Sequence, residues 1–296
     1  MNSRNIKRRL SNKINEWTEQ IRLDESEEAQ AALAAIKADA IITGGAIASL
    51  LQGEEPHDYD VYFQNVDSCL AVAHYYVNLW NKEHSDELSV EYTPETGRIE
   101  CVAPSVGAVF ETDELDETDE LNEPEKQETT SKSKQKKSPY RPIFISTNAI
   151  SLSDDVQIVI RFYGDIDTIH TNYDFVHTTC SYHYYTGKLS LPADALEAII
   201  NKELVYKGSK YPVASVIRTN KFINRGWHIG AGQYVKMALQ ISQLDLTNFE
   251  VFKDQLTGVD TTFFAGMIAK LDKSHKTDVD NFSTAYIINL IDKMYE

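Results

Sequence analysis

The chain has 296 residues, of which 42% are apolar and 25% are charged, with a formal net charge of −16 at pH 7. This length suits two compact domains, and the apolar fraction is high enough for real hydrophobic cores. Such a negative charge normally disfavours nucleic-acid binding, but much of it falls in one stretch of the chain, so it says little about the folded surface.

The sequence shows no sign of membrane insertion or export. No run approaches the ~18 uninterrupted apolar residues of a membrane span. The first nine residues lead into a polar helix instead of the apolar core of a signal peptide. Cys69, Cys101 and Cys180 are scattered and odd in number, which favours a reducing compartment over a disulfide framework or zinc knuckle. We therefore expect a cytoplasmic protein.

Residues 4–36 predict two polar helices that divide near residues 24–27. The first helix has an apolar stripe at helical spacing. We expect residues 1–39 to pack through this stripe on the domain that follows. The stripe consists of Ile6, Leu10, Ile14, Trp17 and Ile21.

Residues 41–51 predict a short strand, a tight turn at Gly44 and Gly45, and one or two turns of helix. Glycine lets the backbone turn sharply and approach a ligand closely. A helix that begins directly after such a turn presents unpaired N–H groups to phosphate oxygens. The stretch therefore predicts a phosphate-binding turn.

Residues 58–63 predict a second strand, with alternating side chains. Asp58 and Asp60 share one face, about 6–7 Å apart along the strand. Two carboxylates at this spacing can bind a hard divalent cation such as Mg²⁺. The alternative is a pair of solvated acids beside an ordinary turn. The opposite face is apolar and is predicted to join the core: Tyr59, Val61 and Phe63.

A helix over residues 67–82 and two short strands at 88–92 and 98–102 come next. The composition then changes abruptly. Residues 111–139 are first strongly acidic and then rich in Lys and Ser, without apolar periodicity. This composition predicts a disordered insertion within the domain.

Strand-like runs follow at residues 143–152, 156–163 and 173–178. Asp174 stands out as an acid within the last of these apolar runs. A buried carboxylate is costly unless it is paired or bound to a metal ion. Asp174 is therefore a candidate third carboxylate of the site, and a structural, hydrogen-bonded aspartate is the equal alternative.

From residue 192 onward the pattern is helical. A helix is predicted from residue 211, with Pro212 in its first turn. Arg218, Lys221 and Arg225 recur every three or four residues on one face. Residues 202–236 contain seven basic residues and one acid, an excess that favours anion binding over a merely solvated face. The side chains predicted to point inward are Val213, Val216, Ile217, Phe222 and Ile223.

The glycine turn with the acidic pair on the next strand resembles the signature of the polymerase-beta-type nucleotidyltransferase superfamily. In that superfamily the two acids bind two metal ions, which activate the attacking hydroxyl and hold the triphosphate. The resemblance implies that Asp58 and Asp60 bind metal. It also implies that Gly44, Gly45 and Ser49 hold the triphosphate.

The second half narrows this resemblance. Residues 215–229 resemble the Arg-x-x-Arg-Phe-Ala-Ala-Arg-Leu-Gly-Phe neck helix of bacterial-type CCA-adding enzymes and poly(A) polymerases. Residues 174–175 resemble the Asp-Phe of their Arg-Arg-Asp-Phe motif. The matches occur in the same order and cover roughly residues 40–240. Overall, the chain looks most similar to nucleotidyltransferase-like proteins of tailed bacteriophages.

The chain also departs from those enzymes. Asn172 and Tyr173 stand where the motif has two arginines. The acidic pair that helps to read the nucleobase in the family falls on Ala214 and Ser215, and only its arginine remains, as Arg218. Selection of C and then A by that protein template is therefore not expected.

These observations predict an α+β fold: a mixed-sheet nucleotidyltransferase head over residues 40–190, then a helical neck and body over residues 191–296. The predicted function is transfer of a nucleoside monophosphate from an NTP to a hydroxyl, with Mg²⁺ or Mn²⁺ as cofactor. Arg218, Lys221 and Arg225 would neutralise phosphates. The expected acceptor is a tRNA-like or other RNA 3′ end, in the host cytoplasm if the protein is phage-encoded. The alternatives are a protein hydroxyl as acceptor and a catalytically degenerate nucleotide-binding or regulatory protein.

Overall fold

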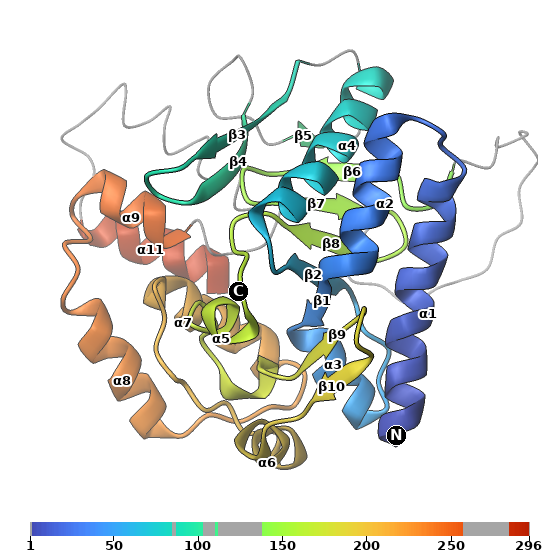
Figure 1. Cartoon of the computed structure of the whole chain (residues 1–296). Coiled ribbons are helices and arrows are strands. Elements are labelled where there is room, and N and C mark those ends of the chain that lie inside the picture. The colour runs from blue at the N-terminus through green and yellow to red at the C-terminus, as the bar shows by residue number, and fades with distance from the viewer. Residues whose placement is uncertain (1, 85–86, 103–109, 112–137, 257–283, 296) are drawn as a thin grey trace, which may run out of the picture.

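The structure is a computed structural model that describes residues 2–84, 87–102, 110–111, 138–256 and 284–295 (Figure 1). The helices are α1 (Ser3–Arg22), α2 (Glu27–Asp39), α3 (Gly45–Gln52), α4 (Val66–His84), α5 (Ile166–His170), the 3₁₀ turn η1 (Val176–Thr178), α6 (Ala193–Asn201), α7 (Pro212–Ile223), α8 (Ala231–Ile241), α9 (Phe249–Leu256) and α11 (Thr284–Tyr295). The strands are β1 (Ala40–Thr43), β2 (Tyr59–Phe63), β3 (Ser89–Thr93), β4 (Arg98–Val102), β5 (Phe110–Glu111), β6 (Pro142–Ile145), β7 (Ala149–Leu152), β8 (Val156–Val159), β9 (Ser181–His183) and β10 (Lys188–Ser190).

The centre of the molecule is a mixed sheet of eight described strands in the order β10-β9-β1-β2-β8-β7-β6-β5. β2 and β8 pair in parallel, and the other neighbours pair antiparallel. The β3–β4 hairpin forms a separate two-stranded sheet. With the helices that follow, this confirms the α+β class and the mixed sheet that the sequence predicts.

The N-terminal helices bury their apolar faces in the main core. α1, α2 and α4 lie together on one side of the central strands (Figure 1). All five residues of the predicted α1 stripe are buried, and the Trp17 indole donates to the buried Tyr76 hydroxyl. β2 contributes to the same core the apolar face that its alternation predicts: Tyr59, Val61 and Phe63.

The predicted strands after the insertion are only partly correct. Residues 143–152 form two strands, because the Ser146 hydroxyl accepts from the amides of Asn148 and Ala149 and closes a turn between them. The predicted strand 156–163 ends at Val159. Residues 173–178 are a bend and a 3₁₀ turn, in which the Thr178 hydroxyl donates to the Phe175 carbonyl. A local side-chain bond of this kind competes with strand pairing, and alternation alone does not reveal it.

The C-terminal helices form a second, smaller apolar cluster. α7, α9 and α11 meet through residues that include Val213, Phe252 and Ile287. Most of the predicted inward face of α7 is buried or partly buried, but Ile223 is 36% exposed, so this part of the prediction is wrong. Ile223 is the last residue of the helix, where the chain turns away from the core.

Two sequence predictions concern regions that the structure describes only in part. The predicted insertion at 111–139 lies almost wholly outside the described residues. The helical interpretation of 244–296 is confirmed for α9 and α11. No helix among the described residues is long and apolar enough to cross a membrane.

Candidate active site

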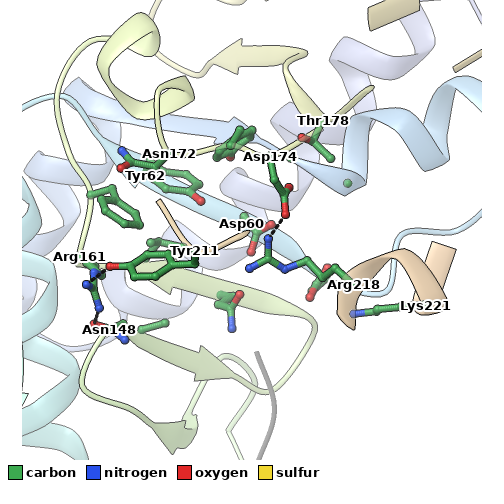
Figure 2. A pocket seen from close by; sticks show the side chains of 18 of the residues that line it. Asp60, Tyr62, Asn148, Arg161, Asn172, Asp174, Thr178, Tyr211, Arg218 and Lys221 are labelled. Carbon is green, nitrogen blue, oxygen red and sulfur yellow. Dashed lines mark hydrogen bonds and ion pairs between the residues drawn. The ribbon is translucent and has the colours of Figure 1, made fainter. Parts of the chain in front are cut away.

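A pocket of about 230 Å³ lies between the β2–β8 part of the sheet and α7. The strands place carboxylates along one side, and α7 supplies basic side chains on the other (Figure 2). Its charged lining residues are Asp58, Asp60, Asp174, Arg161, Arg218, Lys221 and Arg225. The structure thus brings the predicted acidic pair and the predicted basic stripe into one cavity.

Gly44 forms the sharp turn between β1 and α3. Its φ of +100° is a conformation that L side chains rarely adopt, and its N–H donates to the Thr178 carbonyl at 3.1 Å. A Cβ at this position would lie 2.8 Å from Oδ2 of Asp60. By contrast, a Cβ on Gly45 would meet nothing within 4 Å. Only glycine at 44 lets the start of α3 lie directly against the Asp60 carboxylate.

The strand that leads into this turn is held by a buried hydrogen-bond chain. The Thr43 hydroxyl donates to the Cys180 carbonyl at 2.8 Å and lies 2.8 Å from Nε2 of His170. Because the single hydroxyl hydrogen is used, Nε2 must donate to Thr43. Burial lowers the pKa of His170 to about 4, in agreement with a neutral ring. These hydrogen bonds fix the end of β1 beside the pocket.

Asp58 and Asp60 occupy the positions that the sequence predicts. Asp58 is exposed just before β2, and Asp60 is partly buried on β2, where it pairs in register with Gln157 of β8. The Tyr173 hydroxyl is buried near Asp60, and burial followed by the Asp60 charge raises the pKa of Tyr173. Both carboxylates line the cavity, with apolar support behind the strand.

Asp174 has a different environment. Its carboxylate is buried and forms an ion pair with Arg218 of α7. Within the described part of the chain, no three His, Cys, Asp or Glu side chains are grouped so that they could hold a metal ion. Arg218 therefore satisfies the buried charge that made Asp174 conspicuous in the sequence, and a third-carboxylate role for Asp174 stays a prediction.

The remaining predicted nucleotide-binding residues divide into two groups. Lys221 and Arg225 line the pocket, Lys221 from the last turn of α7 and Arg225 from just beyond it. Ser49 does not line it, and lies one turn further along α3 than Gly45, which does.

Sequence reasoning missed a polar and aromatic cluster at the other end of the pocket. Arg161 donates through Nη1 to Oδ1 of Asn148 at 3.1 Å and through Nη2 to the Tyr211 hydroxyl. A usable signal was present, since Asn148 and Arg161 are polar residues inside runs predicted as apolar strands. The same criterion had singled out Asp174.

The architecture is similar to that of solved CCA-adding enzymes. The Thermotoga maritima CCA-adding enzyme complexed with tRNA aligns with a TM-score of 0.39 and 9% identity, over 90% of this chain and 56% of its own. The Bacillus stearothermophilus CCA-adding enzyme in complex with CTP aligns with a TM-score of 0.37 and 13% identity, over 83% and 52%. The alignments thus span about half the length of each enzyme.

Sequence comparison shows the family. The model of the Gad2 family, described as Gabija anti-defense 2 family protein, matches residues 8–202. This is more than half of the chain, so the chain belongs to that family. The Gabija anti-defense 2 protein of Bacillus phage SPbetaL7 is 22% identical over 103 residues, which are 34% of this chain and 26% of the phage protein. The match therefore covers about a quarter of that relative.

Proposed function

We propose that this protein is a metal-dependent nucleotidyltransferase that moves a nucleoside monophosphate from an NTP to a hydroxyl, and that this reaction counteracts Gabija defence. One observation carries the proposal. The Gly44 turn lies against Asp60 directly before α3, in a pocket that Arg218, Lys221 and Arg225 also line. The pocket thus combines a phosphate-binding helix start, an acidic pair and basic side chains.

The donor set fits Mg²⁺ or Mn²⁺. Mg²⁺ is usually held by one or two carboxylates together with waters and substrate phosphates, so Asp58 and Asp60 suffice without a third acid. Glycine at 44 avoids a clash with Oδ2 of Asp60, so the carboxylate keeps its position at the cavity. When bound, the metal would lower the pKa of the acceptor hydroxyl and neutralise charge on the triphosphate.

The protein groups perform the positioning. The first amides of α3 would donate to triphosphate oxygens, while Lys221 and Arg225 would neutralise their charge. Asp174 would fix the direction of the Arg218 guanidinium, since the two side chains are paired. Preorganised donors of this kind stabilise developing charge without reorganisation during the reaction.

RNA is the first acceptor to test, because Arg218, Lys221 and Arg225 bring positive charge to the pocket. A protein hydroxyl is the second. Purified protein would be incubated with each α-labelled NTP, Mg²⁺ and total small RNA from the host. We expect label to enter RNA with the wild type and with Asp292→Asn, an exposed acid on α11 that does not line the pocket, but not with Asp58→Asn/Asp60→Asn.

The same variants test the biological part of the proposal. In cells that carry Gabija, wild-type protein and Asp292→Asn should restore phage plaques, and the double variant should not. Label on protein instead of RNA would change the acceptor. Restored plaques with the double variant would separate anti-defence from catalysis and favour a nucleotide-binding or regulatory protein.

A further inference from the structure

Arg161 is a nearly buried cation at the end of the pocket away from Lys221 (Figure 2). Its side chain is only 7% exposed, and its ion-pair partner among the described residues is Asp254, at 3.9 Å and 52% exposed. Burial lowers the pKa of Arg161. A guanidinium with so weak a counter-charge is costly to bury. In the described part of the chain, two of its five N–H donors bond to Asn148 and Tyr211, and the others are available to the acceptors of a ligand.

The surroundings of Arg161 suit a flat aromatic ligand. The guanidinium lies 5.1 Å from the Tyr211 ring centroid and 5.6 Å from that of Phe162. Tyr62 and Tyr173 also line the cavity, with ring centroids 6.1 Å apart. Aromatic walls around a polar edge favour a nucleobase over a bare phosphate, because every base has a face that can stack.

Asn148 determines which base edge fits. Arginine has no acceptor, so the Asn148 oxygen must face Arg161 and its Nδ2 amide must point elsewhere. Nδ2 has no hydrogen-bond partner among the described residues. Arg161 and Asn148 together therefore offer an edge made of donors.

We propose that Arg161 and Asn148 form a base-reading subsite that selects a guanine nucleotide. Guanine presents two adjacent acceptors, O6 and N7, which match a donor edge. Adenine places an amino donor beside its N7 and is disfavoured. The proposal rests on the proposed function for the statement that a nucleotide occupies this pocket.

The side of the pocket that α7 forms supports this assignment. Ala214 and Ser215 are fully buried, and the Ser215 hydroxyl donates to the Tyr211 carbonyl at 3.2 Å. Arg218 is paired with Asp174. Base reading by the first turns of α7 is therefore blocked, whereas the Arg161 cluster faces the cavity.

The test measures binding, so it does not depend on turnover. Isothermal titration of the full chain with GTP, ATP and tripolyphosphate in Mg²⁺ should show GTP about tenfold tighter than ATP. Arg161→Lys keeps the charge but loses the planar fork, and should equalise GTP and ATP. Asn148→Asp replaces the donor by an acceptor and should shift the preference towards ATP. Tripolyphosphate affinity should stay the same in both variants.

Three results would overturn the subsite. The first is equal wild-type affinity for GTP and ATP. The second is a GTP preference that survives in both variants. The third is a loss of tripolyphosphate affinity in parallel with that of GTP in a folded variant, which would make Arg161 a phosphate ligand. If neither nucleotides nor tripolyphosphate bind the wild type, the proposed function fails as well. Equal binding with intact transfer activity removes only the base selection.

Discussion

The two sides of the pocket each hold a carboxylate, and the surroundings of the two carboxylates differ. On the β1–β2 side, Asp60 is partly buried and lies against the Gly44 turn, which has no side chain to displace its carboxylate. On the α7 side, Asp174 is buried and paired with Arg218. The Asp174 charge is balanced by Arg218, whereas the Asp60 carboxylate lines the cavity beside the turn. Two acids that look alike in the sequence thus have different surroundings.

Neutralising Asp60 tests the β1–β2 side of the pocket. Asp60→Asn keeps the size of the side chain and should lower nucleotide transfer by on the order of 10²-fold or more, because charge stabilisation in the reaction is lost. Transfer is measured with the α-labelled NTP that the wild type uses, and circular dichroism verifies the fold. Asp292→Asn is the matched control. Wild-type turnover by Asp60→Asn would remove this residue from the metal site.

The glycine turn gives the next largest effect. Gly44→Ala adds a methyl group 2.8 Å from Oδ2 of Asp60 at a φ of +100°. We expect a loss of roughly 2–3 kcal/mol in the free energy of unfolding, measured in urea. Gly45→Ala has open space and a helical position, and should raise stability by a few tenths to about 1 kcal/mol. Equal effects of both substitutions would show that the turn does not need glycine at 44.

On the α7 side, Asp174 and Arg218 should contribute to stability as a coupled pair. Arg218→Met leaves the buried Asp174 carboxylate without its arginine and should cost roughly 2–3 kcal/mol of unfolding free energy, less than for a fully buried pair because Arg218 is partly exposed. Adding Asp174→Asn should recover part of this loss. Urea denaturation of the two single variants and the double variant closes the cycle. Additive losses would contradict the coupling.

A smaller change in stability is expected at His177 of η1, whose ring packs against Phe222 of α7. Its ring is buried among Phe175, Phe222 and Trp227, and neither ring nitrogen has a hydrogen-bond partner among the described residues. Burial lowers the pKa of His177 to about 4, although the nearby Asp174 acts in the opposite direction. The neutral ring therefore contributes stability that is complete above pH ~6.5 and is lost as the pH falls towards 4.

His177→Phe should remove this pH dependence. Between pH 7.5 and pH 5 the wild type should lose about 2 kcal/mol more unfolding free energy than the variant. Urea denaturation at the two pH values measures the difference, with the exposed His74→Asn as control. Parallel losses in wild type and His177→Phe would show that His177 has the same pKa in the folded and unfolded states.

Much of the local structure was predictable because it depends on neighbours in sequence. Apolar spacing placed α1 and its buried stripe, and the glycine pair placed the β1–α3 turn. Residues 173–178 were mispredicted, because their β-branched and aromatic residues favour a strand while the Thr178 hydroxyl bonds locally and turns the chain. Ser49 was assigned by resemblance, and only the helix geometry shows that it lies outside the pocket.

The α+β class with its mixed sheet, the glycine turn, the acidic pair and the basic face of α7 could be predicted, since each follows from periodicity or from residue types close along the chain. The partners of these groups depend on the tertiary packing. Asp174 pairs with Arg218, and Arg161 with Asn148 and Tyr211, at separations of 13 to 50 residues along the chain. The physical reason is that a buried charge must find its counterpart in space, and which segment supplies it depends on how the sheet and α7 pack together.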